Sequence, residues 1–123
     1  MTLSALTERQ TTSAGTVTAQ DYRQGMASVA AAMDNETEMI FQIDGVLLMK
    51  KGEADELYAK EDGKKIIDFI REAKEADVEM RVCSAALQLH DMTEDDLIEE
   101  CDGVVGAAYM TDVGLESDLV LNY

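Results

Sequence analysis

Cys83 is the residue of this sequence whose position best suits covalent chemistry. It ends the alternating stretch of residues 78–83, which predicts a strand, and Ser84 begins a segment with the pattern of a short helix. In open α/β sheets, ligands bind beyond the carboxyl ends of the strands, and Cys83 would lie there. A thiol beside the free N–H groups of a helix start ionises more readily. We therefore expect a reactive sulfur in an open pocket of backbone amides, although a free cysteine is also commonly a small buried apolar residue.

The second cysteine and the single histidine are less suited to this chemistry. Cys101 lies between Glu100 and Asp102, whose negative charges disfavour a thiolate, so we expect a structural thiol. His90 follows Cys83 by seven residues, about 10 Å along a helix, which is too far for a direct Cys–His pair. We expect His90 to be a surface or capping residue. Two cysteines are also too few for a disulfide framework.

Asp44, Gly45, Lys50 and Ser84 are the candidates for a supporting role beside Cys83. Asp44 and Gly45 end an apolar run that predicts a buried strand, so Asp44 would face the same edge of the sheet and tune a bound group. An Asp-Gly pair is equally typical of a plain turn. Lys50 would either attract an anionic ligand or simply close a short helix.

The composition narrows the classes of function. With one His and no Cys-x-x-Cys pair, we expect no metal site, and nothing points to a cofactor. The net charge of −16, from 26 acidic and 10 basic side chains, repels phosphate backbones and disfavours nucleic-acid binding. Such a charge is typical of proteins from a high-salt cytoplasm, where screening acts over about 3 Å at 1 M salt, and a docking face for a basic partner is the alternative.

No apolar run approaches the roughly 20 residues of a membrane span and no secretory signal is present, so we expect a cytoplasmic protein without membrane contact.

Alternating strands and helices must position these residues. The 123 residues suffice for one core, and the alternation predicts a single three-layer α/β/α domain with a mostly parallel sheet of four or five strands. Residues 1–19 are either a weak first strand at residues 3–6 or a flexible segment, and residues 20–123 form the α/β domain. Strands are predicted at residues 38–44, 78–83, 103–108 and 119–123, and helices at residues 20–33, 46–49, 63–76, 84–90, 93–100 and 111–117.

Four stretches, taken in order, resemble the DsrE-like family of sulfur-relay proteins, and the resemblance covers residues 38–123. The stretches are residues 41–52, 82–87, 96–108 and 117–121. The resemblance implies a parallel α/β fold, a trimeric or hexameric assembly, and a cysteine at Cys83 that carries sulfane sulfur as a persulfide in members that work as sulfurtransferases. The polar start of the chain departs from the apolar first strand that is usual in this family.

These observations favour a small sulfurtransferase-like carrier. In this hypothesis Cys83 accepts sulfur from a donor protein and passes it to an acceptor protein. Two other hypotheses stay open. One is a non-catalytic oligomeric module that binds a ligand or a partner, with Cys83 merely packed. The other is a redox sensor in which Cys83 and Cys101 form a disulfide.

Overall fold

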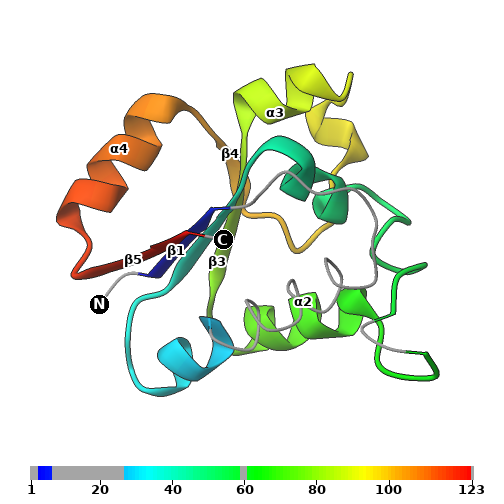
Figure 1. Ribbon diagram of the computed structural model, residues 1–123, viewed down its shortest axis with the longest axis horizontal. Helices are drawn as coiled ribbons and strands as arrows, with labels where there is room; N and C mark the ends of the chain where they lie inside the picture. Colours follow the sequence, from blue (N-terminus) through cyan, green and yellow to red (C-terminus); the bar gives the residue numbers. More distant parts are fainter. Residues whose placement is uncertain (1–2, 7–26, 59–60, 123) are drawn as a thin grey trace.

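The computed structural model describes residues 3–6, 27–58 and 61–122, which form a five-stranded sheet with helices around it (Figure 1). The order of the strands is β4-β3-β2-β1-β5, and every neighbouring pair is parallel. The predicted fold class, an α/β domain with a parallel sheet, is therefore confirmed. The strands are β1 (Leu3–Leu6), β2 (Glu38–Phe41), β3 (Glu79–Cys83), β4 (Gly103–Val105) and β5 (Leu119–Asn122).

The helices lie on both faces of this sheet. Successive connections from β1 to β4 step in one direction, and the chain then returns from the β4 edge to the β5 edge through α4. Because crossovers between parallel strands are right-handed, this return places α4 on the face opposite α2, as Figure 1 shows. The helices are η1 (Ile43–Met49), α2 (Ile66–Glu75), α3 (Ser84–Leu89), η2 (Glu94–Asp96) and α4 (Ala107–Glu116), and residues 27–32 are helical as well.

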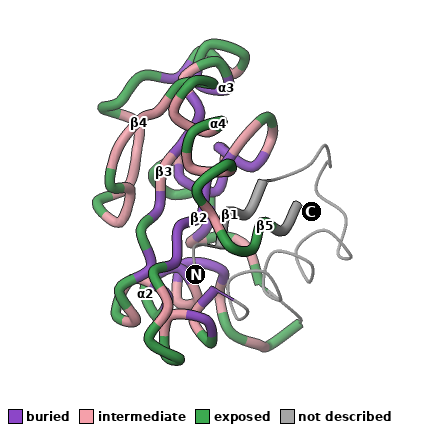
Figure 2. Tube along the Cα trace, turned by 90° about the vertical axis from the view of Figure 1, so that its left-hand side faces the viewer, coloured by how far each residue is buried: buried purple, intermediate pink, exposed green. Residues whose placement is uncertain are grey.

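The hydrophobic core lies between α2 and the sheet. Ile66, Ile70 and Ala73 recur at three- and four-residue steps, so one stripe of α2 faces the strands. β2 is buried along its whole length, as expected for an inner strand with helices on both faces. Figure 2 shows buried residues running through β2, whereas α4 has no buried residue. Complete burial of an Ile side chain stabilises a fold by roughly 1.5–3 kcal/mol, so the α2 stripe holds this helix in place.

The helix predicted over residues 93–100 is only the single 3₁₀ turn η2. Thr93 and Asp96 close a capping box around this turn. The next residue, Leu97, is extended and forms an antiparallel β-bridge with Lys50. The chain therefore leaves the helical conformation because tertiary pairing with the end of η1 takes over.

The strand predicted over residues 103–108 ends at Val105. Gly106 is extended and caps α4, which begins at Ala107 and is ten residues long. The last helix is therefore longer than the one predicted over residues 111–117. Alanine is the best helix former, so the small residues that suggested a strand suit the first turn of a helix equally well.

β1 is the strand that sequence patterning left undecided. It pairs with β2 on one side and with β5 on the other, so it lies inside the sheet. The remainder of residues 1–19 and the first part of the helix predicted over residues 20–33 lie outside the described residues.

Candidate functional site

Cys83 lies at the predicted junction between a strand and a helix. It is the last residue of β3, the half-exposed Ser84 begins α3, and across the sheet Cys83 pairs with Val105 at the end of β4. The Cys83 residue is only 8% exposed and belongs to the hydrophobic core. The open pocket predicted from the sequence is therefore wrong for the isolated chain. α3 contacts β3 and buries its own Ala86 and Leu87, which leaves little room around the end of the strand.

The segment after β2 becomes helical sooner than predicted. β2 ends at Phe41 and η1 begins at Ile43, whose left-handed φ of 50° redirects the chain. The N–H of Gly45 then donates to the carbonyl of Gln42 at 2.8 Å. Asp44 is therefore the second residue of a 3₁₀ helix and not the end of a strand, and Gly45 is buried inside that helix.

Asp44 contacts His90, a pairing that the sequence did not predict. The Oδ1 atom of Asp44 lies 3.2 Å from Nε2 of His90. His90 is the C-cap residue of α3, as the capping alternative predicted, but its ring also reaches η1. Among the described residues, His90 Nε2 is a buried nitrogen with no aligned hydrogen-bond partner, so the two groups are within reach but poorly oriented.

Lys50 lies at the end of η1 that is remote from Asp44. It is the C-cap of η1. The hydrogen bond from the backbone N–H of Thr93, together with the positive charges of Lys50 and Lys51, lowers the pKa of Asp96. Lys50 thus stands at the end of a short helix, the position that the helix-end interpretation gives it.

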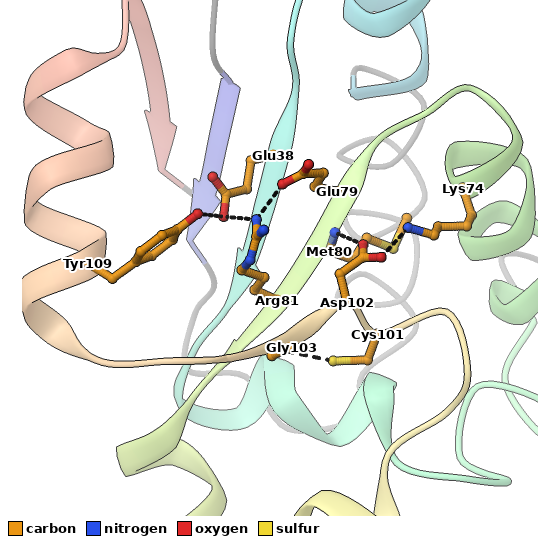
Figure 3. Close-up of polar contacts among 9 residues, drawn as sticks. All are labelled: Glu38, Lys74, Glu79, Met80, Arg81, Cys101, Asp102, Gly103 and Tyr109. Carbon is orange, nitrogen blue, oxygen red and sulfur yellow. Dashed lines mark hydrogen bonds and ion pairs between the residues drawn. The ribbon is translucent and has the colours of Figure 1, made fainter.

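A polar cluster that the sequence analysis missed joins β3 to β2 and α4. Arg81 Nη1 donates to Oε1 of Glu38 and to Oε2 of Glu79, both at 2.6 Å. The Tyr109 hydroxyl donates to the same Glu38 oxygen at 2.9 Å (Figure 3). Residues two apart in a strand share a face, so Glu79 and Arg81 lie on the face of β3 that is turned toward α4. The available signal was a pair of charged residues, Glu79 and Arg81, on one face of the strand predicted over residues 78–83.

This cluster is held together by charge as well as by hydrogen bonds. Burial alone would lower the pKa of Arg81, but the hydrogen bonds and charges of Glu79 and Glu38 outweigh burial, so its pKa is raised. Burial, reinforced by the hydrogen bond to Glu38, raises the pKa of Tyr109. The Arg81 guanidinium also lies 5.3 Å from the centroid of the Tyr109 ring. The cluster therefore ties α4 to β2 and β3.

Cys101 is half-buried in the loop before β4, and its surroundings suit a structural role. Its Sγ donates to the carbonyl of Gly103 at 3.5 Å. Burial raises the pKa of the Cys101 thiol, and the charge of Asp102 acts in the same direction. Asp102 is itself held by the backbone N–H of Met80 at 2.7 Å and by Lys74 (Figure 3). The raised pKa agrees with the structural thiol expected from the sequence, with burial as its main cause.

The two cysteines are too far apart for an intramolecular disulfide. Cys83 pairs with Val105, whereas Cys101 precedes Gly103 at the other end of β4. Gly103 is two strand positions, about 6.5 Å, away from Val105, the partner of Cys83. Cys101 lies two residues before Gly103 and is therefore farther still from Cys83. A disulfide requires Cα atoms within about 7 Å, so the geometry opposes the redox-sensor hypothesis.

A cavity of about 220 Å³ opens at the amino ends of β2 and β3, whereas Cys83 lies at the carboxyl end of β3. The cavity is lined by Glu36, Thr37, Glu38, Asp77 and Glu79. The four carboxylates in this lining disfavour an anionic ligand.

Within the described part of the chain, no group of three His, Cys, Asp or Glu side chains is arranged to hold a metal ion. None of the helices described there is both long and apolar enough to cross a membrane.

The sequence and the fold both match known proteins. The sequence matches the DsrE/DsrF-like family over residues 10–123. The fold is similar to the crystal structure of the YchN protein from E. coli, with a TM-score of 0.74 and 11% identity over 99% of this chain and 97% of that one. It is also similar to MTH1491, a protein of unknown function from Methanobacterium thermoautotrophicum, with a TM-score of 0.69 and 16% identity over the same shares of the two chains. No curated protein sequence matches the chain.

Proposed function

The chain belongs to the DsrE/DsrF-like family, which is associated with sulfur relay, and on this premise we propose that it carries sulfane sulfur as a persulfide on Cys83. The observation that carries the proposal is the position of Cys83, at the carboxyl end of a parallel strand and directly before a helix. Ligand sites in open α/β sheets lie at this edge. Cys101 is the weaker candidate, because burial raises the pKa of its thiol and because it lies near the amino end of β4, away from the carboxyl ends of the strands.

The proposed chemistry is thiol–persulfide exchange. Cys83 loses its proton, and its thiolate attacks the outer sulfur of a donor persulfide. The bond between the two donor sulfurs breaks as the bond from Cys83 Sγ forms, and the donor leaves as a thiolate that can take up a proton. An acceptor thiolate then attacks the same outer sulfur and releases Cys83. Neither transfer needs an external oxidant or reductant, because the sulfane sulfur keeps its oxidation state.

Donor and acceptor would be cytoplasmic proteins whose thiols reach the end of β3. The small exposed fraction of Cys83 means that these partners must meet a chain in which the surrounding elements have moved. A reducing compartment suits this chemistry, since both cysteines are free thiols in the structure.

The proposal includes assembly with further copies of the chain, as a trimer or a hexamer. α4 has no buried residue, and its Leu115 is 81% exposed. Leu119 and Val120 of the edge strand β5 are also exposed. An uncovered apolar helix next to an open sheet edge favours contact with another chain. The net charge of −16 opposes that contact until salt screens it, in line with the high-salt cytoplasm that the composition favours.

The burial of Cys83 favours a second candidate function. In that alternative, the chain is a non-catalytic module of the same family that binds a ligand or a partner, and Cys83 is a packed core residue. The two functions differ in one property, which is whether Cys83 reacts while the protein is folded.

Incubation of the folded protein with a small-molecule persulfide donor tests the carrier function. We expect intact-mass spectrometry to detect one added sulfur atom in the wild type and in Cys101→Ser, and none in Cys83→Ser. Cys101→Ser is the matched control, because it also removes one thiol. Added sulfur that persists in Cys83→Ser would refute the assignment, and no uptake by any variant would favour the non-catalytic module.

A further inference from the structure

β3, α3 and η1 pack against one another, and η1 joins the other two elements only through tertiary packing. β3 ends at Cys83, α3 follows it at once, and η1 contacts both β3 and α3. All three elements contribute residues to the core that contains Cys83. Because Cys83 is only 8% exposed, its sulfur becomes accessible only when part of this packing opens.

α3 has little stability of its own. It has six residues, and isolated helices shorter than about 12 residues are marginal in water. Its N-cap residue makes no side-chain capping hydrogen bond. α3 therefore stays in place through its contacts, namely the burial of Ala86 and Leu87 and the packing of α3 against η1.

The contact between Asp44 and His90 is a polar link between η1 and α3. Asp44 lies near the start of η1, and His90 ends α3. Their side chains are 32% and 21% exposed and their nearest polar atoms are 3.2 Å apart. Because Nε2 of His90 is buried without an aligned partner, this link is only partly formed in the present arrangement. A small movement of α3 would make or break it.

We propose that the Asp44–His90 contact is a latch that holds α3 over Cys83, and that its release admits the sulfur of a partner. This inference rests on the proposed function, since it concerns access to the same sulfur. Asp44 and His90 are positioning residues in this proposal, because they act through α3 and do not contact the transferred sulfur.

Alkylation of the folded protein by iodoacetamide, followed at each cysteine by peptide mass spectrometry, tests the latch. We expect Asp44→Ala and His90→Ala each to increase the alkylation rate of Cys83 about three- to tenfold. The alkylation rate of Cys101 should not change, because that thiol lies near the amino end of β4, away from α3. The double variant should be no faster than the faster single variant, since both substitutions remove the same contact.

Asp91→Asn is the matched control. Asp91 is exposed, neighbours His90 and has a left-handed φ of 52°, which Asn tolerates as well as Asp. It removes one negative charge beside the latch, and we expect no change in the Cys83 rate. Equal acceleration at Cys83 and Cys101 would indicate general destabilisation and overturn the latch, as would unchanged rates in both Ala variants. Sulfur uptake by the wild type is measured in a separate experiment. Failure of the latch and failure of the persulfide proposal can therefore be told apart.

Discussion

Arg81 and Glu38 form an ion pair inside the molecule, with Nη1 of Arg81 2.6 Å from Oε1 of Glu38 and the Glu38 side chain only 8% exposed. The pair joins β3 to β2, and Tyr109 extends it to α4. A buried carboxylate costs several kcal/mol unless its partners compensate for lost hydration, so Glu38 depends on both residues. α4, which has no buried residue, is thereby anchored to the sheet.

Arg81→Leu should destabilise the protein by about 2–4 kcal/mol, because it leaves Glu38 covered and without its counter-charge. Urea denaturation followed by circular dichroism measures this change in the free energy of unfolding. Arg71→Leu is the control, since the Arg71 side chain is 56% exposed in its pair with Glu100 and should contribute only about 0–1 kcal/mol. Similar losses in the two variants would show that the Glu38 pair behaves as a surface pair.

Tyr109→Phe should lower the free energy of unfolding by about 1 kcal/mol at neutral pH, because Glu38 loses one hydrogen bond.

The wild type should also lose stability at alkaline pH. The pKa of Tyr109 is raised above its ordinary value of 10.0, so the folded state holds this proton more tightly than the unfolded state. The resulting stabilisation is complete below about pH 10 and declines as the pH rises through the folded-state pKa. Thermal unfolding between pH 8 and 11 should therefore show a flatter decline in Tyr109→Phe, and parallel curves would contradict the assignment.

Cys101 should react slowly with iodoacetamide in the folded protein. Only the thiolate reacts, and burial holds the pKa of Cys101 above its ordinary value of 9.0. Its rate should keep rising as the pH passes 9, the point at which an ordinary thiol begins to level off. Alkylation of Cys83→Ser across this range isolates the Cys101 reaction, and the same protein in urea supplies the reference for an uncovered thiol. Identical pH profiles in the folded and unfolded protein would remove the basis for ranking Cys101 second.

Salt should stabilise the protein and promote its assembly. The net charge of −16 creates self-repulsion that is screened over about 10 Å at 0.1 M salt and about 3 Å at 1 M. We expect a rise in the thermal midpoint across this range, and a mass by light scattering that shifts from one chain toward a trimer or hexamer. Leu115→Glu, which places a charge on the exposed face of α4, should keep the monomer at high salt without lowering its thermal midpoint. A monomer at every salt concentration would contradict assembly through α4.

The patterns that proved informative were local ones. The alternation of residues 78–83 predicted β3, and the helical stripe of residues 63–76 predicted α2, because both periods are properties of consecutive residues. Position 83 at the end of a strand follows from the same pattern. The pattern was less informative at residues 93–100 and 103–108, where capping and pairing with distant segments decided how far each element extends.

The amino-acid sequence was enough to predict a parallel α/β domain, a thiol at a strand-to-helix junction, and a second thiol in acidic surroundings. The place of β1 between β2 and β5, the burial of Cys83 and the contact of Asp44 with His90 could be seen only in the folded chain. Folding also brought Arg81 to Glu38, which precedes it by 43 positions. The reason is that strand order and register place distant residues side by side, and burial follows from that placement. Neither is contained in the periodicity of a short stretch of chain.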